Sequence, residues 1–295
     1  MPTAVGVTTT LVRLHTRDGV ALDGVLAEPA RRRRTALVWV HGLGSVFSSG
    51  QPLIRELSAQ LTAAGVGYFK FNTRGHDVVA GRGAQMAGAA FERFGASVED
   101  LRTVIAFARR RGFPRIVLAG HSTGANKALH YVARTRDRRV VALMLLGPVS
   151  DIAGEARRLG AAELRRRVAT ARRLAARDPR ALVPRAWGFW SARRYVSLYA
   201  PGQAEDVFPY YRASARWTAL RAVRVPLAAI VGGADEYLDR PAAALLEAFA
   251  HKATGARSFT GLVVPRANHS FVGHERALAA LMVRFIREAR LGARR

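Results

Sequence analysis

The hydrophobic positions of the chain fall into short uninterrupted runs, and longer amphipathic segments separate these runs. The clearest apolar runs cover residues 35–40, 66–72, 116–119, 140–146, 227–231 and 261–264. Helical patterns lie between them, for example over residues 52–64 and 98–111. Strands that are buried on both faces are apolar throughout, so this alternation predicts an α/β fold with a mostly parallel central sheet and helices on both faces.

The first part of the chain has a different pattern, in which apolar and polar residues alternate. Residues 8–27 follow this pattern and are broken at Asp18 and Gly19. An Asp-Gly pair between two strand-like runs is typical of a tight turn. The segment therefore predicts a β-hairpin ahead of the parallel strands.

The segment from 151 to 218 contains no run of the buried-strand type. It begins with an arginine-rich helical pattern in which Leu164, Val168, Ala171 and Ala175 share one face. Eight aromatic residues follow, which could either line a pocket or pack this segment onto the core: Trp187, Phe189, Trp190, Tyr195, Tyr199, Phe208, Tyr210 and Tyr211. We therefore predict three parts: a first core part at 1–150, an inserted helical cap at 151–218, and a second core part at 219–295.

The strongest chemical motif is a G-x-S-x-G sequence centred on Ser122. It follows the apolar run at 116–119 directly and precedes a helical pattern at 125–133. A serine on such a strand-to-helix turn is typical of a nucleophile elbow, where the helix N-terminus stabilises negative charge. We predict Ser122 as a nucleophile.

A second glycine-containing turn, His41-Gly42-Leu43-Gly44, follows the apolar run at 35–40. A turn at this place can bring a main-chain N–H group towards the nucleophile. The predicted oxyanion hole consists of the N–H groups of Leu43 and Thr123, which would stabilise the charge that develops on a carbonyl oxygen.

The acid and the base of a catalytic triad are expected after the last two apolar runs. Asp235 follows residues 227–231, and His269 follows residues 261–264. A histidine can take the nucleophile's proton, and a carboxylate can hold the imidazole in the correct tautomer. We predict Asp235 and His269 in these roles, in the order Ser122, Asp235, His269 along the chain.

Other residues near these positions remain alternatives. Glu236 and Asp239 could replace Asp235 as the acid, and His274 could replace His269 as the base. Spacing along the chain alone does not separate them. Asp235 could also be an ordinary helix-capping residue.

These motifs resemble those of the α/β-hydrolase superfamily over most of the chain. The turn Arg74-Gly75-His76 is similar to one that is common in the superfamily. Three stretches resemble more closely the fungal siderophore ester hydrolases and their relatives: GHSTG at 120–124, RYVSLYAPG at 194–202 and DEYL at 235–238. This resemblance implies an α/β-hydrolase fold and hydrolysis of ester bonds in hydroxamate siderophores or similar acyl compounds.

Composition changes this picture only a little. The 295 residues include no cysteine, which excludes disulfides, thiolate metal sites and a cysteine nucleophile. No metal-binding or phosphate-cradling motif is found, so we expect neither a metal nor a cofactor. The N-terminal region has no apolar stretch of the signal-peptide kind, and the run at 140–146 is far too short for a membrane span. We expect a cytoplasmic protein.

The net charge of +26 comes almost entirely from arginine. A basic chain of this kind can bind nucleic acid or an anionic surface. The arginines are spread along the whole chain, however, and a GC-rich genome favours arginine and alanine codons. We therefore expect no specific nucleic-acid partner.

The predicted function is hydrolysis of a small-molecule carboxylic ester through an acyl-enzyme on Ser122. A thioesterase or an acyltransferase could use the same triad. A binding protein that retains the hydrolase scaffold without turnover is the alternative from a different class. The oligomeric state stays open.

Overall fold

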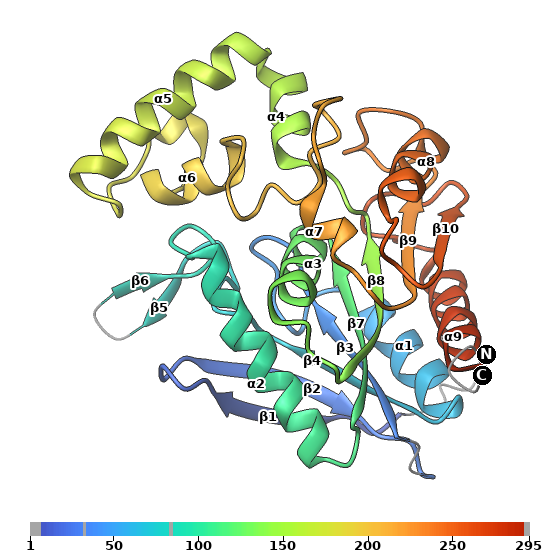
Figure 1. Ribbon diagram of the computed structural model, residues 1–295. Helices are drawn as coiled ribbons and strands as arrows, with labels where there is room; N and C mark the ends of the chain where they lie inside the picture. Colours follow the sequence, from blue (N-terminus) through green and yellow to red (C-terminus); the bar gives the residue numbers. More distant parts are fainter. Residues whose placement is uncertain (1–6, 32–33, 83–84, 292–295) are drawn as a thin grey trace.

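The protein is built on a central twisted sheet (Figure 1). The computed structural model describes residues 7–31, 34–82 and 85–291. Within these residues the sheet has eight strands: β1 (Thr10–His15), β2 (Ala21–Ala27), β4 (Val66–Phe71), β3 (Thr35–Val40), β7 (Arg115–His121), β8 (Val140–Leu146), β9 (Leu227–Gly232) and β10 (Phe259–Val264), given in their spatial order.

The pairing of the strands confirms the predicted hairpin and the mostly parallel sheet. β1 and β2 are antiparallel and are joined through Gly19, whose φ of 75° favours glycine. β2 is antiparallel to β4, and every later neighbour pair from β4 to β10 is parallel. All residues of β3, β4 and β9 are buried, as continuous apolar runs predict.

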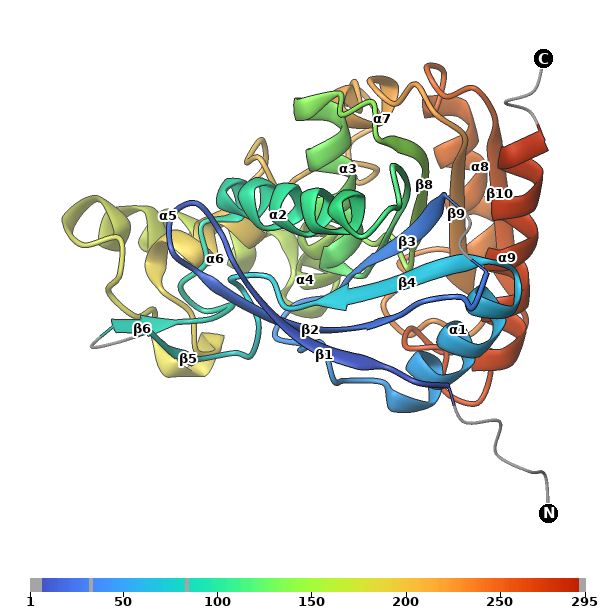
Figure 2. The same cartoon turned by 90° about the horizontal axis from the view of Figure 1, so that it is seen from below.

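Helices cover both faces of the sheet, and each face has its own hydrophobic core (Figure 2). The core helices are α1 (Gln51–Ala63), α2 (Ser97–Arg110), α3 (Thr123–Thr135), α7 (Thr218–Arg221), α8 (Ala242–Lys252) and α9 (Glu275–Leu291). α1 and α9 pack against each other and fill one face with Leu57, Leu61 and Leu278. α2, α3 and α8 contribute apolar side chains to the core on the other face.

Three further helices form a layer above the carboxyl ends of the strands (Figure 1). They are α4 (Asp151–Leu159), α5 (Ala161–Arg177) and α6 (Ala192–Tyr199). Leu164, Val168 and Ala171 of α5 are buried in a separate hydrophobic cluster together with Tyr195, as the shared helical face predicts. The boundaries 151–218 for a cap stay a prediction.

A small hairpin that the sequence did not predict lies beside these helices. β5 (Ala80–Arg82) and β6 (Gln85–Ala87) pair antiparallel outside the main sheet. Arg180, which follows α5, donates a hydrogen bond of 2.6 Å to the carbonyl oxygen of Met86. This contact ties the hairpin to the end of the three-helix layer.

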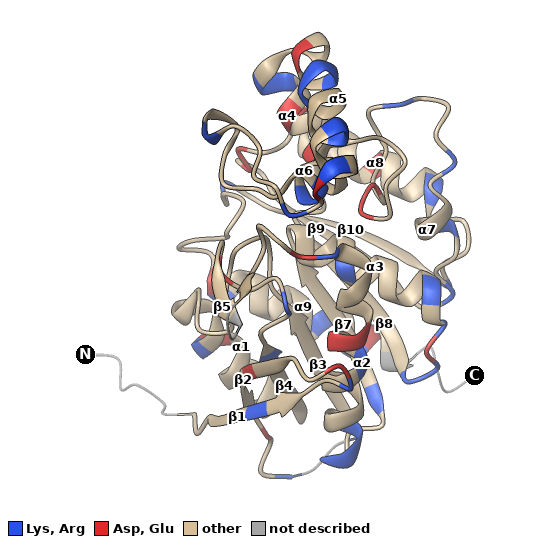
Figure 3. Ribbon diagram, turned by 90° about the vertical axis from the view of Figure 1, so that its left-hand side faces the viewer, with Lys and Arg blue, Asp and Glu red and all other residues tan. Residues whose placement is uncertain are grey.

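The basic residues are distributed over several parts of the molecule. Figure 3 shows Lys and Arg on α5 and also around the core. The absence of a specific nucleic-acid partner stays a prediction. In the described part of the chain, no helix has both the length and the hydropathy needed to cross a bilayer.

Candidate active site

Ser122 occupies the sharp turn between β7 and α3. Its φ of 56° and ψ of −131° lie in a region that non-glycine residues rarely adopt, so the backbone is strained there. Its N–H donates to the carbonyl oxygen of Leu146 on β8 at 2.9 Å, and its own carbonyl oxygen accepts from Ala125 at 2.8 Å. These bonds hold the serine at the head of α3, in the geometry of a nucleophile elbow.

The two glycines that flank this turn are required by close backbone contacts. A Cβ atom on Gly120 would lie 2.2 Å from the carbonyl oxygen of Gly124. A Cβ atom on Gly124 would lie 2.2 Å from the carbonyl oxygen of Val40, on the neighbouring strand β3. Both distances are far below van der Waals contact, so the G-x-S-x-G pattern follows from the packing of α3 against the sheet.

Asp235 and His269 are brought together from two different strands. Asp235 follows β9, and His269 follows β10. His269 Nδ1 lies 2.8 Å from Asp235 Oδ2, and both side chains are buried. A buried carboxylate at this distance accepts a hydrogen bond from Nδ1–H, which leaves the lone pair of Nε2 available to accept a proton.

The competing residues occupy different positions. The carboxylate of Glu236 accepts a hydrogen bond from the main-chain N–H of His269 at 2.9 Å, not from its ring. Asp239 pairs with the adjacent Arg240 at 2.9 Å. His274 is half-buried, with Nδ1 3.2 Å from the carbonyl oxygen of Val272. Among the three candidate acids, only Asp235 has a hydrogen bond with the imidazole ring of His269 in the described structure.

His121 also fixes the segment that carries His269. His121 Nε2 lies 2.8 Å from the carbonyl oxygen of His269, and this contact requires Nε2 to donate. Burial lowers the pKa of His121 to about 4, so its ring is neutral near pH 7. Glu236 and His121 thus hold the N–H and the C=O of the same residue. The sequence analysis missed this role, because His121 occupies the variable position before the serine.

The turn after β3 approaches the serine closely. A Cβ atom on Gly42 would lie 3.0 Å from the Cβ atom of Ser122. Leu43, the next residue, is half-buried. Among the described residues, no hydrogen-bond acceptor is found for the N–H of Leu43 or of Thr123. Two unengaged N–H groups flanking a nucleophile are suited to bind an oxyanion.

His41 stabilises that turn from inside the protein. The N–H of Thr73 donates to His41 Nε2 at 2.9 Å, so the ring proton is on Nδ1. Nδ1 lies 2.9 Å from the carbonyl oxygen of Gly42 and donates to it. Burial and the nearby Lys127 lower the pKa of His41 to about 3, which keeps the ring neutral. The sequence placed His41 in the turn but gave its side chain no role.

A buried network of charged residues connects this region to the helices above the sheet. Lys127 on α3 forms a salt bridge of 2.7 Å with Glu92 and donates to Thr73 Oγ1 at 3.0 Å. Arg194 on α6 lies 3.7 Å from Glu92 and donates to Glu205 at 3.0 Å. The four charged side chains are at most 1% exposed. This network could not be predicted from the sequence, because its members lie far apart along the chain, up to 113 positions from Glu92 to Glu205.

Asp151 at the start of α4 lies close to this network. Desolvation and the neighbouring carboxylate of Glu205 raise its pKa to about 7, while Arg194 acts in the opposite direction. A carboxyl group with this pKa changes its charge near neutral pH.

The aromatic residues of the segment 151–218 have mixed roles. Most pack internally: Tyr195 and Phe208 are buried, and the Phe208 ring lies 5.3 Å from that of Phe249 in the core. Tyr199 and Tyr211 instead line a cavity of about 570 Å³ beside α4 and α5. Phe189 is 41% exposed.

No group of three or more His, Cys, Asp or Glu side chains that could hold a metal ion occurs within residues 7–31, 34–82 and 85–291. The prediction that no metal takes part stays a prediction.

Comparisons with known proteins bear on the fold and the family. The family model described as "Serine aminopeptidase, S33" matches residues 31–276. Comparison with curated proteins finds no significant sequence match.

Three solved structures are similar over nearly the whole chain. A siderophore hydrolase from Aspergillus fumigatus is 21% identical, with a TM-score of 0.68 over 98% of this chain and 99% of that one. A monoglyceride lipase from Saccharomyces cerevisiae is 15% identical, with a TM-score of 0.69 over 97% of both chains. An esterase from Pyrococcus furiosus is 16% identical, with a TM-score of 0.64 over 98% and 94%. At these identities the likeness concerns the fold, and it confirms the predicted α/β-hydrolase architecture.

Proposed function

Because this chain belongs to the serine aminopeptidase S33 family, and is therefore a serine hydrolase of the α/β-hydrolase fold, we propose that it hydrolyses carboxylic esters of small molecules. Ser122 is the proposed nucleophile, His269 the base and Asp235 the residue that orients the base. The observation that carries the proposal is the 2.8 Å contact between His269 Nδ1 and Asp235 Oδ2. This contact leaves Nε2 available as a base at the carboxyl ends of the strands, where Ser122, with its strained backbone, directly precedes α3.

The reaction proceeds in two halves. Ser122 Oγ attacks the acyl carbon while its proton passes to His269 Nε2, and the N–H groups of Leu43 and Thr123 bind the negative oxygen. The tetrahedral intermediate expels the alcohol, which takes the proton from His269, and an acyl-enzyme remains. Water then attacks the acyl carbon and gives its proton to His269. The bond from the acyl carbon to Ser122 Oγ breaks, Oγ takes that proton back from His269 Nε2, and the free acid is released. These groups supply all of the chemistry without a cofactor.

The segment at 151–218 acts as the proposed cap over this site. The helices α4 to α6 lie above the carboxyl ends of the strands, where Ser122, Asp235 and His269 are located. Substrates in α/β folds bind outside the carboxyl ends of the strands. The cap and the core would therefore enclose the acyl compound between them.

The ester class is favoured by the solved structures that share the fold. Among them are proteins described as a siderophore hydrolase, a monoglyceride lipase and an esterase. The family description names an aminopeptidase, so amide hydrolysis is the second reaction to test. A thioesterase or an acyltransferase would use the same triad and differ only in the acyl donor or in the acceptor.

The test compares hydrolysis of p-nitrophenyl acetate, butyrate and octanoate by the wild type and by Ser122→Ala. We expect turnover by the wild type and a loss on the order of 10⁴-fold or more in the variant. Ser214→Ala, at an exposed position in a loop, is the matched control and should retain full activity. An aminoacyl p-nitroanilide in the same assay tests amide hydrolysis.

A fluorophosphonate probe separates the remaining alternative. A folded wild type that neither turns over any ester nor reacts with the probe would support a binding protein on a hydrolase scaffold. Equal ester hydrolysis by Ser122→Ala and the wild type would contradict the assignment of the nucleophile.

A further inference from the structure

A second concave site lies at the end of the sheet opposite to Ser122. It is a cavity of about 800 Å³ lined at the amino-terminal ends of consecutive strands. Arg115 begins β7, Val140 begins β8, and Pro226 and Ser258 precede β9 and β10. Strand β7 has seven residues, so Arg115 and Ser122 are separated by roughly 20 Å at 3.3 Å per residue. A ligand in this cavity would not touch the proposed catalytic residues.

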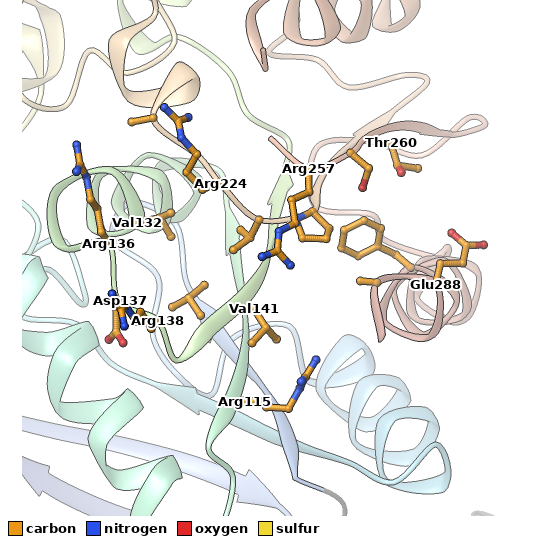
Figure 4. Close-up of a pocket in the computed structure, with 17 residues that line it drawn as sticks. Arg115, Val132, Arg136, Asp137, Arg138, Val141, Arg224, Arg257, Thr260 and Glu288 are labelled. Carbon is orange, nitrogen blue, oxygen red and sulfur yellow. The ribbon is translucent and has the colours of Figure 1, made fainter. Parts of the chain in front are cut away.

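Arginine dominates the charged lining of the cavity. Five arginines from four segments contribute to it: Arg115, Arg136, Arg138, Arg224 and Arg257. In Figure 4, Arg115 and Arg257 extend towards the space beside Val141. Within the described chain, none of the five forms a salt bridge with a carboxylate. Arg136 and Arg224 extend away from this space (Figure 4), and Arg224 donates to the carbonyl oxygens of Arg221 and Val223 at 2.6 and 3.0 Å. Arg115 and Arg257 are therefore the two cations that face the space directly.

The two carboxylates that line the cavity do little to offset this charge. Asp137 is already engaged by Arg139 at 2.7 Å and by the hydroxyl of Tyr131 at 2.6 Å. Glu288 is exposed at the rim and lies 3.7 Å from Arg284. An anion entering the cavity therefore meets the guanidinium groups of Arg115 and Arg257 (Figure 4), which have no carboxylate partner among the described residues.

The floor of the cavity is apolar. Val132, Val140 and Phe285 are buried there, and Val141 and Ala289 are half-buried beside them. A ligand that fits must combine several negative charges with an apolar or aromatic body. A volume of about 800 Å³ lies within the range of small-molecule sites and exceeds the size of a single inorganic phosphate.

We propose that this cavity binds a small organic polyphosphate of the size of a nucleoside diphosphate. The planar guanidinium groups bind phosphate oxygens in pairs, which suits two linked phosphates better than a single carboxylate. The organic body lies against Val132, Val141 and Phe285. The proposal is independent of the esterase reaction, because the cavity contains no residue of the proposed triad.

The test uses isothermal titration with ADP, pyrophosphate and adenosine at physiological salt. The site variant is Arg115→Gln with Arg257→Gln. The control is Arg17→Gln with Arg55→Gln, which removes the same charge at exposed positions outside the cavity. We expect ADP to bind more tightly than pyrophosphate, adenosine not to bind, and only the cavity variant to lose at least tenfold in ADP affinity.

Several results would overturn the proposal. An equal loss of ADP affinity in both double variants would mean that ADP binds through the net charge of the protein and not at this cavity. Equal binding of ADP and pyrophosphate would mean an inorganic anion site without a role for the apolar floor. Binding of polyuridylate without binding of ADP would mean a nucleic-acid surface.

Thermal unfolding without any ligand gives a second readout. Removing Arg115 and Arg257 should leave the unfolding temperature without ligand unchanged or raise it, whereas ADP should raise the unfolding temperature of the wild type and of the control variant much more than that of the cavity variant. A lower unfolding temperature of the cavity variant without ligand would show that these arginines support the fold, and would overturn the proposal as well.

Discussion

Replacing Glu92 with glutamine isolates the energetic role of the buried charges. The substitution keeps the shape of the side chain and removes one negative charge. Glu92 contacts Lys127 at 2.7 Å, and among the described residues the Lys127 ammonium also donates to the neutral hydroxyl of Thr73. Arg194 keeps Glu205 as its partner. The variant therefore leaves the buried Lys127 without a counterion.

The size of the effect follows from the burial of both partners. The side chains of Lys127 and Glu92 are 1% and 0% exposed, so solvent does not compensate for the lost charge. Removing one partner of a fully buried ion pair typically costs about 3–5 kcal/mol. With an unfolding entropy of about 2.1 cal/mol/K per residue, a chain of 295 residues should lose roughly 5–8 °C in unfolding temperature.

Thermal and urea unfolding, followed by circular dichroism, measure this loss. Glu288→Gln removes the same charge from an exposed ion pair with Arg284 on α9 and should leave the unfolding temperature essentially unchanged. The double variant Glu92→Gln with Lys127→Met should recover much of the loss, because no charge is then left unpaired at this position. If Glu92→Gln unfolds within about 2 °C of the control, the reasoning about the network is wrong.

Two further predictions concern the carboxylates near the site. Asp235→Asn should lower ester turnover by about 10⁴-fold, because the amide NH₂ can donate to Nδ1 and so favours the tautomer with its proton on Nε2, which cannot act as the base. Glu236→Gln keeps an oxygen for the main-chain N–H of His269 and should lose far less; equal losses in kcat would contradict the assignment of the acid. Asp151→Asn should stabilise the protein at pH 8 and hardly at pH 4.5 in urea titrations. Its folded pKa of about 7 lies above its unfolded value, so the cost of the charge is absent at low pH and grows as the pH rises to about 7. The same gain at both pH values would refute this.

The sheet could be predicted from the sequence because the burial of a strand determines which of its residues are apolar. Strands buried on both faces are continuous apolar runs, and the runs at 35–40 and 227–231 match β3 and β9 within one residue. The motif around Ser122 was recognisable for a related reason. Its glycines are imposed by backbone contacts that the fold always makes at this turn.

The buried charges could not be predicted in this way. Lys127, Glu92 and Arg194 look like solvent-facing residues, since charged side chains are rarely buried without a partner. Their partners come from distant parts of the chain, and a single sequence gives no information on which of them meet. The role of His121 could not be predicted because the G-x-S-x-G motif allows any residue at its position. Its partner, the carbonyl oxygen of His269, lies 148 positions further along the chain.

Arg194 connects the proposed cap to the core through buried charges, and this contact affects how the cap could be exchanged between related proteins. The arginine and Glu205 belong to the segment above the sheet, whereas Glu92 and Lys127 belong to the parts beneath it. If the segment 151–218 came from a relative without a cation at this position, Lys127 would be the only cation left beside the buried Glu92. The interface would then have one positive charge fewer than in this protein. Exchange of the segment is therefore limited by the need to match these buried charges. A designer of new specificities would need to transfer Arg194 and Glu205 together with Glu92 and Lys127.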